Sequence, residues 1–153
     1  MRANASELGI SPDHIAVTGN SAGGHLSLMV AGVDGALYPD LEGDSGTPGV
    51  SSAVQACGAV YPVVIASPHK STTNPIGRLG SHHVAKTVMP AGSTARDLVG
   101  FSPITYASGD FPPTCFLHGN GDTLVGTQES FKMYEEINSR GGHAELHMFA
   151  SAP

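Results

Sequence analysis

The sequence predicts an α/β fold, a doubly wound and mostly parallel β-sheet, in a single domain spanning residues 1–153. Three observations indicate this class. Short apolar segments alternate along the chain with segments of helical periodicity. The 20 Gly and 11 Pro separate these segments without forming a low-complexity tract. Charged residues make up only 13% of the chain, about half the usual share, as expected for a largely covered sheet.

The first half of the chain predicts a helix, a strand, a helix, a turn-rich loop and a second strand. Gly9 is a plausible C-cap for the first helix because glycine readily adopts the left-handed conformation. Pro62 interrupts or ends the second strand because proline has no N–H for the ladder. The first helix is predicted at residues 3–8 and the first strand at 15–18. The second helix runs to about residue 31, the loop covers 34–52, and the second strand covers 54–64.

The second half predicts an irregular excursion, then a strand, a helix and a last strand. The excursion covers about residues 66–110, and such segments often form lids over α/β sites. Phe131, Tyr134 and Ile137 recur at helical spacing and are predicted to be core residues. The three elements that follow the excursion fall at residues 114–117, 127–139 and 143–149.

Cys57 and Cys115 both fall in predicted strands. Two cysteines make no disulfide framework, so buried free thiols are expected. A bridge stays open if the two strands are neighbours.

The motif most informative about chemistry is G-x-S-x-G at residues 19–23, between a predicted strand and a predicted helix. This is the setting of a nucleophile elbow, a strained turn that exposes the serine, here Ser21, at its apex. Side chains at Gly19 or Gly23 are expected to collide with the neighbouring strand or helix. The new helix also directs free N–H groups toward an anion formed at the serine. The alternative is a Gly/Ser-rich turn without chemistry.

A second motif, residues 118–125, follows the strand predicted at 114–117 and contains Asp122. Acids at the carboxyl ends of strands are placed where α/β sheets hold their catalytic groups. A serine followed along the chain by an acid is also the order found in hydrolases of this kind. The alternative is a structural role for Asp122, as an Asx turn or a helix N-cap near Thr127.

With these motifs the chain resembles the α/β-hydrolase superfamily, most closely its small-molecule carboxylesterase branch, including feruloyl- and acetylxylan-esterase-like members. Residues 11–26 are similar to that family's D-P-x-R-I-x-x-x-G-x-S-A-G-G-H-L. Residues 111–130 resemble P-P-x-x-x-x-H-G-x-x-D-x-x-V-P-x-x-Q-S, and residues 101–106 and 145–149 resemble further segments. The resemblance implies a partial α/β-hydrolase fold.

The resemblance also implies roles for individual residues. Ser21 is the nucleophile that forms an acyl-enzyme, Asp122 orients a histidine base, and the backbone N–H of Ala22 is one oxyanion donor. In the family the histidine follows the last strand, and an upstream loop gives the second donor. The sequence matches neither of these, so we expect a piece cut at both ends, and a poor enzyme.

The eight histidines offer no clear replacement base. His25 is expected on the surface of the helix after Ser21, and His118 is expected to brace the Asp122 loop. His82 and His83 lie in the excursion, and His147 is expected to point out of the sheet face. No set of His, Cys, Asp and Glu has metal-ligand spacing in the sequence, so neither a metal nor a cofactor is expected.

Charge and hydropathy restrict the partners. The net charge is −6 without a basic patch, which argues against nucleic acid. No segment approaches the roughly 18 apolar residues of a membrane span, and no targeting segment is present, so a cytoplasmic location is expected. Without early strands, one sheet edge is expected to be exposed and to favour a homo-oligomer.

Three functional hypotheses remain. The first is a serine esterase acting on small-molecule short-acyl esters through Ser21. The second is a serine peptidase or arylformamidase, since these relatives have similar motifs. The third is a catalytically silent hydrolase fragment or binding scaffold.

Overall fold

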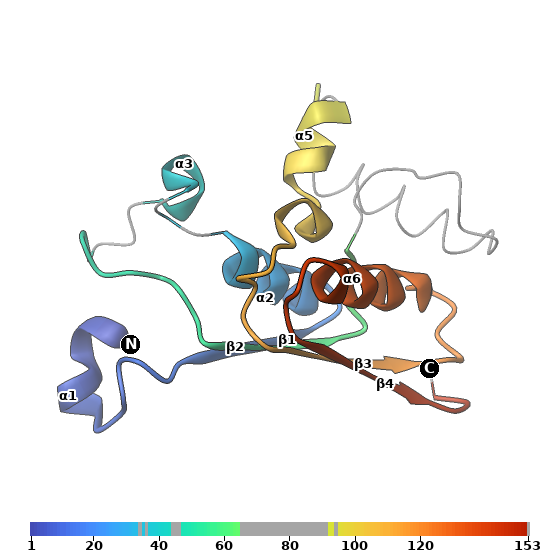
Figure 1. Ribbon diagram of the computed structural model, residues 1–153, viewed down its shortest axis with the longest axis horizontal. Coiled ribbons are helices and arrows are strands. Elements are labelled where there is room, and N and C mark those ends of the chain that lie inside the picture. The colour runs from blue at the N-terminus through green and yellow to red at the C-terminus, as the bar shows by residue number, and fades with distance from the viewer. Residues whose placement is uncertain (34, 36, 44–46, 65–91, 94, 153) are drawn as a thin grey trace.

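The computed structural model describes residues 1–33, 35, 37–43, 47–64, 92–93 and 95–152 (Figure 1). Within these ranges four strands form one parallel sheet, and their order across the sheet, β1-β2-β3-β4, is also their order along the chain. Their bounds are β1 Ala16–Asn20, β2 Ala56–Val60, β3 Thr114–Gly119 and β4 Ala144–Phe149. The predicted α/β class with a parallel sheet is confirmed.

Helices connect and flank these strands (Figure 1). They are η1 Arg2–Asn4, α1 Ala5–Leu8, α2 Ala22–Gly32, α3 Pro39–Glu42, α5 Ala95–Gly100, η2 Pro103–Tyr106 and α6 Gln128–Ser139. Gly9 caps α1 as predicted, with φ +65° and its N–H donating to the carbonyls of Ala5 and Ser6.

Three predicted segments differ from the structure. The helix predicted at residues 3–8 is divided into η1 and α1, and the loop predicted at 34–52 contains α3. Most of the predicted excursion, residues 66–91 and 94, lies outside the described residues. Its described remainder is not irregular, because it contains α5 and η2.

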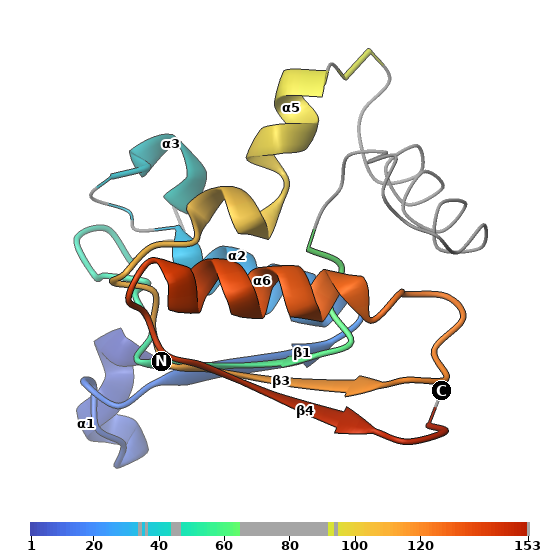
Figure 2. The same ribbon diagram turned by 45° about the vertical axis from the view of Figure 1, so that its right-hand side comes forward.

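Both long helices lie on the same face of the sheet (Figure 2). Helix α2 packs on β1 and β2, whereas α6 packs on β3 and β4. Right-handed crossovers between strands that follow one another in chain order place every connection on one face, which explains this arrangement. Within the described residues no helix packs on the opposite face, where Thr18, Glu145, His147 and Phe149 are exposed. We call this surface the open face.

The core lies between the sheet and the two long helices, with Leu28, Phe116, Met133 and Ile137 fully buried. The prediction that Phe131 belongs to this core is wrong, because Phe131 is 37% exposed. Each helical residue advances by about 100°, and α6 turns Met133 and Ile137 toward the sheet, which places Phe131 off that stripe. Ile137 is confirmed as a core residue, and Tyr134 packs partly buried against the core.

The two cysteines lie on neighbouring strands but on opposite faces of the sheet. Cys57 pairs with Thr114, and Cys115 pairs with Gly58, so the one-residue offset points the thiols in opposite directions. Cys57 is buried in the core, and burial raises the pKa of its thiol to about 12. Cys115 is only half-buried, on the open face. Both are free, as expected, and the register rules out the bridge that the sequence left open.

Strand β1 forms one edge of the described sheet and β4 the other. Self-association through such an edge stays a prediction. None of the helices in the described ranges is long and apolar enough to cross a membrane.

Candidate active site

Ser21 occupies a strained turn between β1 and α2. Its backbone has φ +51° and ψ −119°, a conformation that costs free energy for any residue other than glycine. The turn is held at both ends. The N–H of Ser21 donates to the carbonyl of Val60 on β2 at 2.9 Å, and its own carbonyl accepts from the N–H of His25 at 3.0 Å. These bonds fix the Ser21 side chain, which is half-buried, at the carboxyl end of the sheet.

Glycines at two positions allow this turn. A Cβ on Gly19 would lie 2.4 Å from both the carbonyl carbon and the carbonyl oxygen of Gly23, and a Cβ on Gly24 would lie 3.1 Å from the Val60 carbonyl oxygen. The collision predicted for a side chain at Gly23 is wrong, since a Cβ there meets nothing within 4 Å. The backbone of Gly23 is what a side chain at position 19 would strike, so within this pair only Gly19 must be glycine.

Asp122 lies in the loop that follows β3, at the same end of the sheet as Ser21. Its Oδ1 accepts hydrogen bonds from the N–H groups of Leu124 and Val125, both at 2.8 Å. The Asx turn considered as an alternative is therefore present, whereas Thr127, the N-cap of α6, makes no side-chain cap hydrogen bond. This turn uses only Oδ1. No hydrogen bond to Oδ2 is found among the described residues. The distance from Asp122 Oδ2 to His118 Nε2 is 3.6 Å.

His118 braces the Asp122 loop, as the sequence predicted. Its Nε2 is 3.0 Å from the carbonyl oxygen of Val125, which can only accept, so Nε2 carries the proton. In the neutral ring Nδ1 then accepts from the Ser130 hydroxyl at 2.8 Å. Because both nitrogens are engaged and the ring is fully buried, His118 is not available as a base for Ser21.

This brace predicts a stability effect at Ser130. Replacing Ser130 with alanine leaves the buried Nδ1 of His118 without a donor, and we expect the free energy of unfolding to fall by about 1–3 kcal/mol. The matched control is Ser139→Ala in the same helix, where an exposed hydroxyl donates to the Glu136 carbonyl. Urea unfolding monitored by circular dichroism measures both. Equal midpoints for the two variants would contradict the bracing role.

His25 differs from its predicted place on the helix surface. It is only 5% exposed, its Nδ1 lies 2.9 Å from the carbonyl of Val63, and its ring lies 4.5 Å from that of Phe101. Burial lowers its pKa, against the opposing effect of the Val63 hydrogen bond, so the ring is neutral. Its Nε2 has no hydrogen-bond partner among the residues that the structure describes. These contacts give His25 a packing role between α2 and the segment after β2.

The other histidines of the described ranges lie away from Ser21 and Asp122. His14 bonds to Ser11 ahead of β1, His143 precedes β4, and His147 lies on the open face as predicted. His82 and His83 lie outside the described residues. Of the histidines that the structure describes, none is hydrogen-bonded to both Ser21 and Asp122.

Tyr61, which sequence reasoning missed, follows β2 between the strands that precede Ser21 and Asp122. Tyr61 has φ +36°, a strained value for an aromatic residue, and its N–H donates to the Leu117 carbonyl at 2.8 Å. Its hydroxyl accepts from Asn20 Nδ2 at 2.8 Å. Tyr61 therefore ties the residue before Ser21 to the middle of the sheet. A tyrosine before proline at a strand end is too common a pattern to predict this.

Parallel strand geometry sets the separation between Ser21 and Asp122. They follow β1 and β3, which are separated by β2, so the ends of the two strands lie two strand spacings of about 4.8 Å, or roughly 10 Å, apart. This spacing between the strand ends leaves room for an imidazole ring. Ala22, the first residue of α2, is exposed at the same carboxyl end of the sheet.

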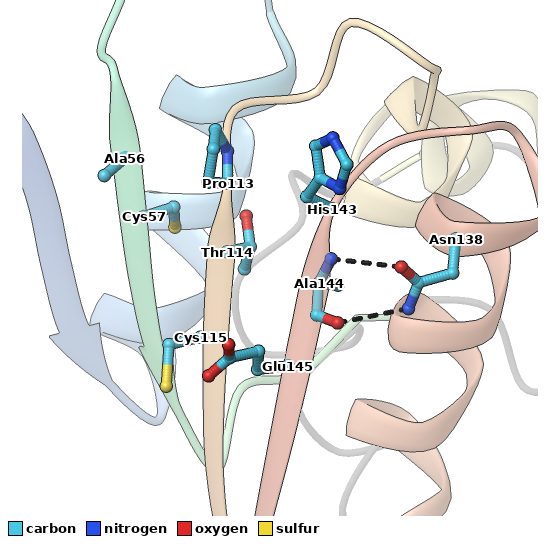
Figure 3. A pocket seen from close by; sticks show the side chains of 9 residues that line it. All are labelled: Ala56, Cys57, Pro113, Thr114, Cys115, Asn138, His143, Ala144 and Glu145. Atoms are coloured by element: carbon cyan, nitrogen blue, oxygen red, sulfur yellow. Dashed lines mark hydrogen bonds between the residues drawn. The ribbon is translucent and has the colours of Figure 1, made fainter.

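A hollow of about 410 Å³ lies elsewhere, at the amino ends of β2, β3 and β4 (Figure 3). The residues that line it are Ala56, Cys57, Pro113, Thr114, Cys115, Asn138, His143, Ala144 and Glu145. Ser21 and Asp122 are at the opposite ends of these parallel strands. The hollow is therefore separate from the candidate active site.

Comparisons with known proteins find a matching family and similar proteins. The BD-FAE family model matches residues 1–137. LipM, a probable carboxylic ester hydrolase of Mycobacterium tuberculosis, is 35% identical over 139 residues, covering 90% of this chain and 31% of LipM. Esterase LipQ of the same organism is 31% identical over 156 residues, covering 95% of this chain and 34% of LipQ.

Among solved structures, Thermogutta terrifontis esterase 2 phosphonylated by sarin matches with a TM-score of 0.79 at 27% identity, covering 99% of this chain and 51% of that one. The chain thus spans about a third of the length of the two mycobacterial relatives and about half of the solved chain.

Proposed function

The chain belongs to the BD-FAE family, and from this we propose that it acts as a serine carboxylic ester hydrolase, with Ser21 as nucleophile and Asp122 as acid. The family, the mycobacterial relatives and the esterase structures confirm the resemblance to α/β-hydrolase esterases. One observation supports the residue roles above the others. Ser21 lies in a strained strand-to-helix turn, and Asp122 follows the strand two positions away, at the same carboxyl end of the sheet.

In the proposed reaction, Ser21 Oγ attacks the carbonyl carbon of a short-acyl ester while a histidine accepts the hydroxyl proton. Asp122 Oδ2 accepts a hydrogen bond from the other ring nitrogen and stabilises the imidazolium. The N–H of Ala22, at the start of α2, stabilises the oxyanion. The alcohol leaves with the proton from the imidazolium, and water then releases the acid from Ser21. We do not assign this base to a particular histidine, because none among the described residues is hydrogen-bonded to both Ser21 and Asp122.

Two other functions stay open. A serine peptidase or arylformamidase would use the same nucleophile and acid on an amide. A silent scaffold would keep the fold without turnover, and it is favoured because no histidine among the described residues is hydrogen-bonded to both Ser21 and Asp122.

The test is hydrolysis of p-nitrophenyl acetate by the chain, by Ser21→Ala and by the control Ser6→Ala, each with and without added imidazole. Imidazole supplies a soluble base, and we expect it to raise the Ser21-dependent rate by about tenfold or more. The Ser21→Ala rate then measures the direct reaction of imidazole with the ester.

Equal rates for the chain and Ser21→Ala under both conditions would reject the esterase and favour the scaffold. Ser21-dependent turnover of p-nitroacetanilide, without turnover of the ester, would favour the amide-cleaving alternative.

A further inference from the structure

Three potential metal ligands meet on the open face of the sheet. The ligand atoms of Cys115, Glu145 and His147 all lie within 4.8 Å of one another. The parallel register produces this cluster. Cys115 on β3 pairs directly with Glu145 on β4, and His147 is two residues further along β4, so its side chain points to the same face.

The side chains already approach one another. Figure 3 shows the Glu145 carboxylate reaching across toward β3, where Cys115 lies. His147 Nε2 lies 3.3 Å from Glu145 Oε2. The cluster is accessible, since the side chains of His147 and Glu145 are 55% and 77% exposed. An ion can therefore reach it from solvent without displacing the core.

The donor set favours one kind of ion. A thiolate, an imidazole nitrogen and a carboxylate oxygen are the ligands that Zn²⁺ takes in proteins, whereas Ca²⁺ and Mg²⁺ require oxygen ligands. A thiolate and a carboxylate also balance the charge of Zn²⁺ when the imidazole is neutral. Tetrahedral Zn²⁺ places its ligand atoms about 3.5 Å apart, so the cluster must contract by roughly 1 Å. The exposed Glu145 and His147 side chains have the rotamer freedom to do so.

We propose that Cys115, Glu145 and His147 form a Zn²⁺ site with an open fourth position. The site lies on the face away from α2 and α6, and it is separate from the proposed active site at the ends of β1 and β3. The sequence could not indicate it, because Cys115 is 30 positions from Glu145 and only the register of β3 with β4 brings them together. Binding requires the loss of the Cys115 thiol proton, so affinity should rise with pH.

The first experiment titrates the reduced chain with Zn²⁺ against a chromophoric chelator. We expect one Zn²⁺ per chain. Each of Cys115→Ser, Glu145→Gln and His147→Gln should weaken binding by about tenfold or more. The control His14→Gln removes an exposed histidine elsewhere, and Ser21→Ala tests independence from the active site; both should bind as the parent chain does. Circular dichroism checks that each variant keeps its fold.

The second experiment measures the reaction of the thiols with a disulfide reagent. Cys57 is buried, with its thiol pKa raised to about 12, so the folded chain should react at Cys115 only. Zn²⁺ should slow that reaction, and Glu145→Gln should remove the protection. Absence of Zn²⁺ binding, or binding that none of the three ligand variants weakens, would overturn the proposal. Unchanged thiol reactivity in saturating Zn²⁺ would also overturn it.

Discussion

Replacing Gly19 with alanine is expected to lower the free energy of unfolding by about 3 kcal/mol or more and to remove Ser21-dependent turnover. The added Cβ would lie 2.4 Å from the carbonyl carbon and oxygen of Gly23, which is far inside van der Waals contact. These are backbone atoms, so no side-chain rotation can relieve the overlap. The strand end and the first turn of α2 must separate, and Ser21 lies between them.

The matched control is Gly23→Ala, the other partner of the same contact. A Cβ at this position meets nothing within 4 Å, and alanine favours helix over glycine, so the stability should be unchanged or higher by up to about 1 kcal/mol. Urea unfolding and the esterase assay are run on both variants. If both destabilise the chain equally, the close approach of residues 19 and 23 is not what requires glycine.

Asp122→Asn is expected to reduce Ser21-dependent turnover by up to about 10⁴-fold, or down to the Ser21→Ala rate if that is reached first. Asparagine keeps an oxygen that can accept from the N–H groups of Leu124 and Val125, so the loop should keep its structure. It puts an NH₂ group in place of Oδ2, and this group cannot accept a hydrogen bond from the ring N–H of a histidine base.

A second substitution separates structure from catalysis at the same position. Asp122→Ala also removes the two hydrogen bonds that Oδ1 accepts from the N–H groups of Leu124 and Val125, so it should lower the free energy of unfolding as well, by about 1–2 kcal/mol. Asp110→Asn, on an exposed residue ahead of β3, serves as the control and should change neither quantity. Full turnover in Asp122→Asn would show that another group is the acid and that Asp122 only shapes the loop.

The features that sequence predicted well depend on neighbours along the chain. Gly9 ends α1 because glycine tolerates positive φ, and the G-x-S-x-G run places Ser21 at the strand-to-helix turn. Asp122 was predicted at the carboxyl end of a strand because an apolar run ends just before it. These patterns depend on local backbone sterics and on burial periodicity, which a single sequence records.

The features that sequence missed depend on contacts between distant segments. Phe131 matched the helical spacing, yet the direction in which α6 faces the sheet left it exposed. His25 was expected on a helix surface, but the segment after β2 covers it. Tyr61 and the Cys115 cluster follow from which strands become neighbours and in what register. Spacing along one chain does not contain that information.

The agreement between strand order and chain order bears on how the domain assembles during synthesis. Each strand finds its partner in the strand made just before it, so the sheet can grow by addition at one edge. The intervals are unequal, because residues 61–113 separate β2 from β3 whereas residues 120–143 separate β3 from β4. At roughly 5–20 residues per second, the β1–β2 pair waits several seconds for its third strand. During that wait, the edge of β2 that later pairs with β3 has no partner strand, which makes this nascent chain the stage at which a chaperone is most needed.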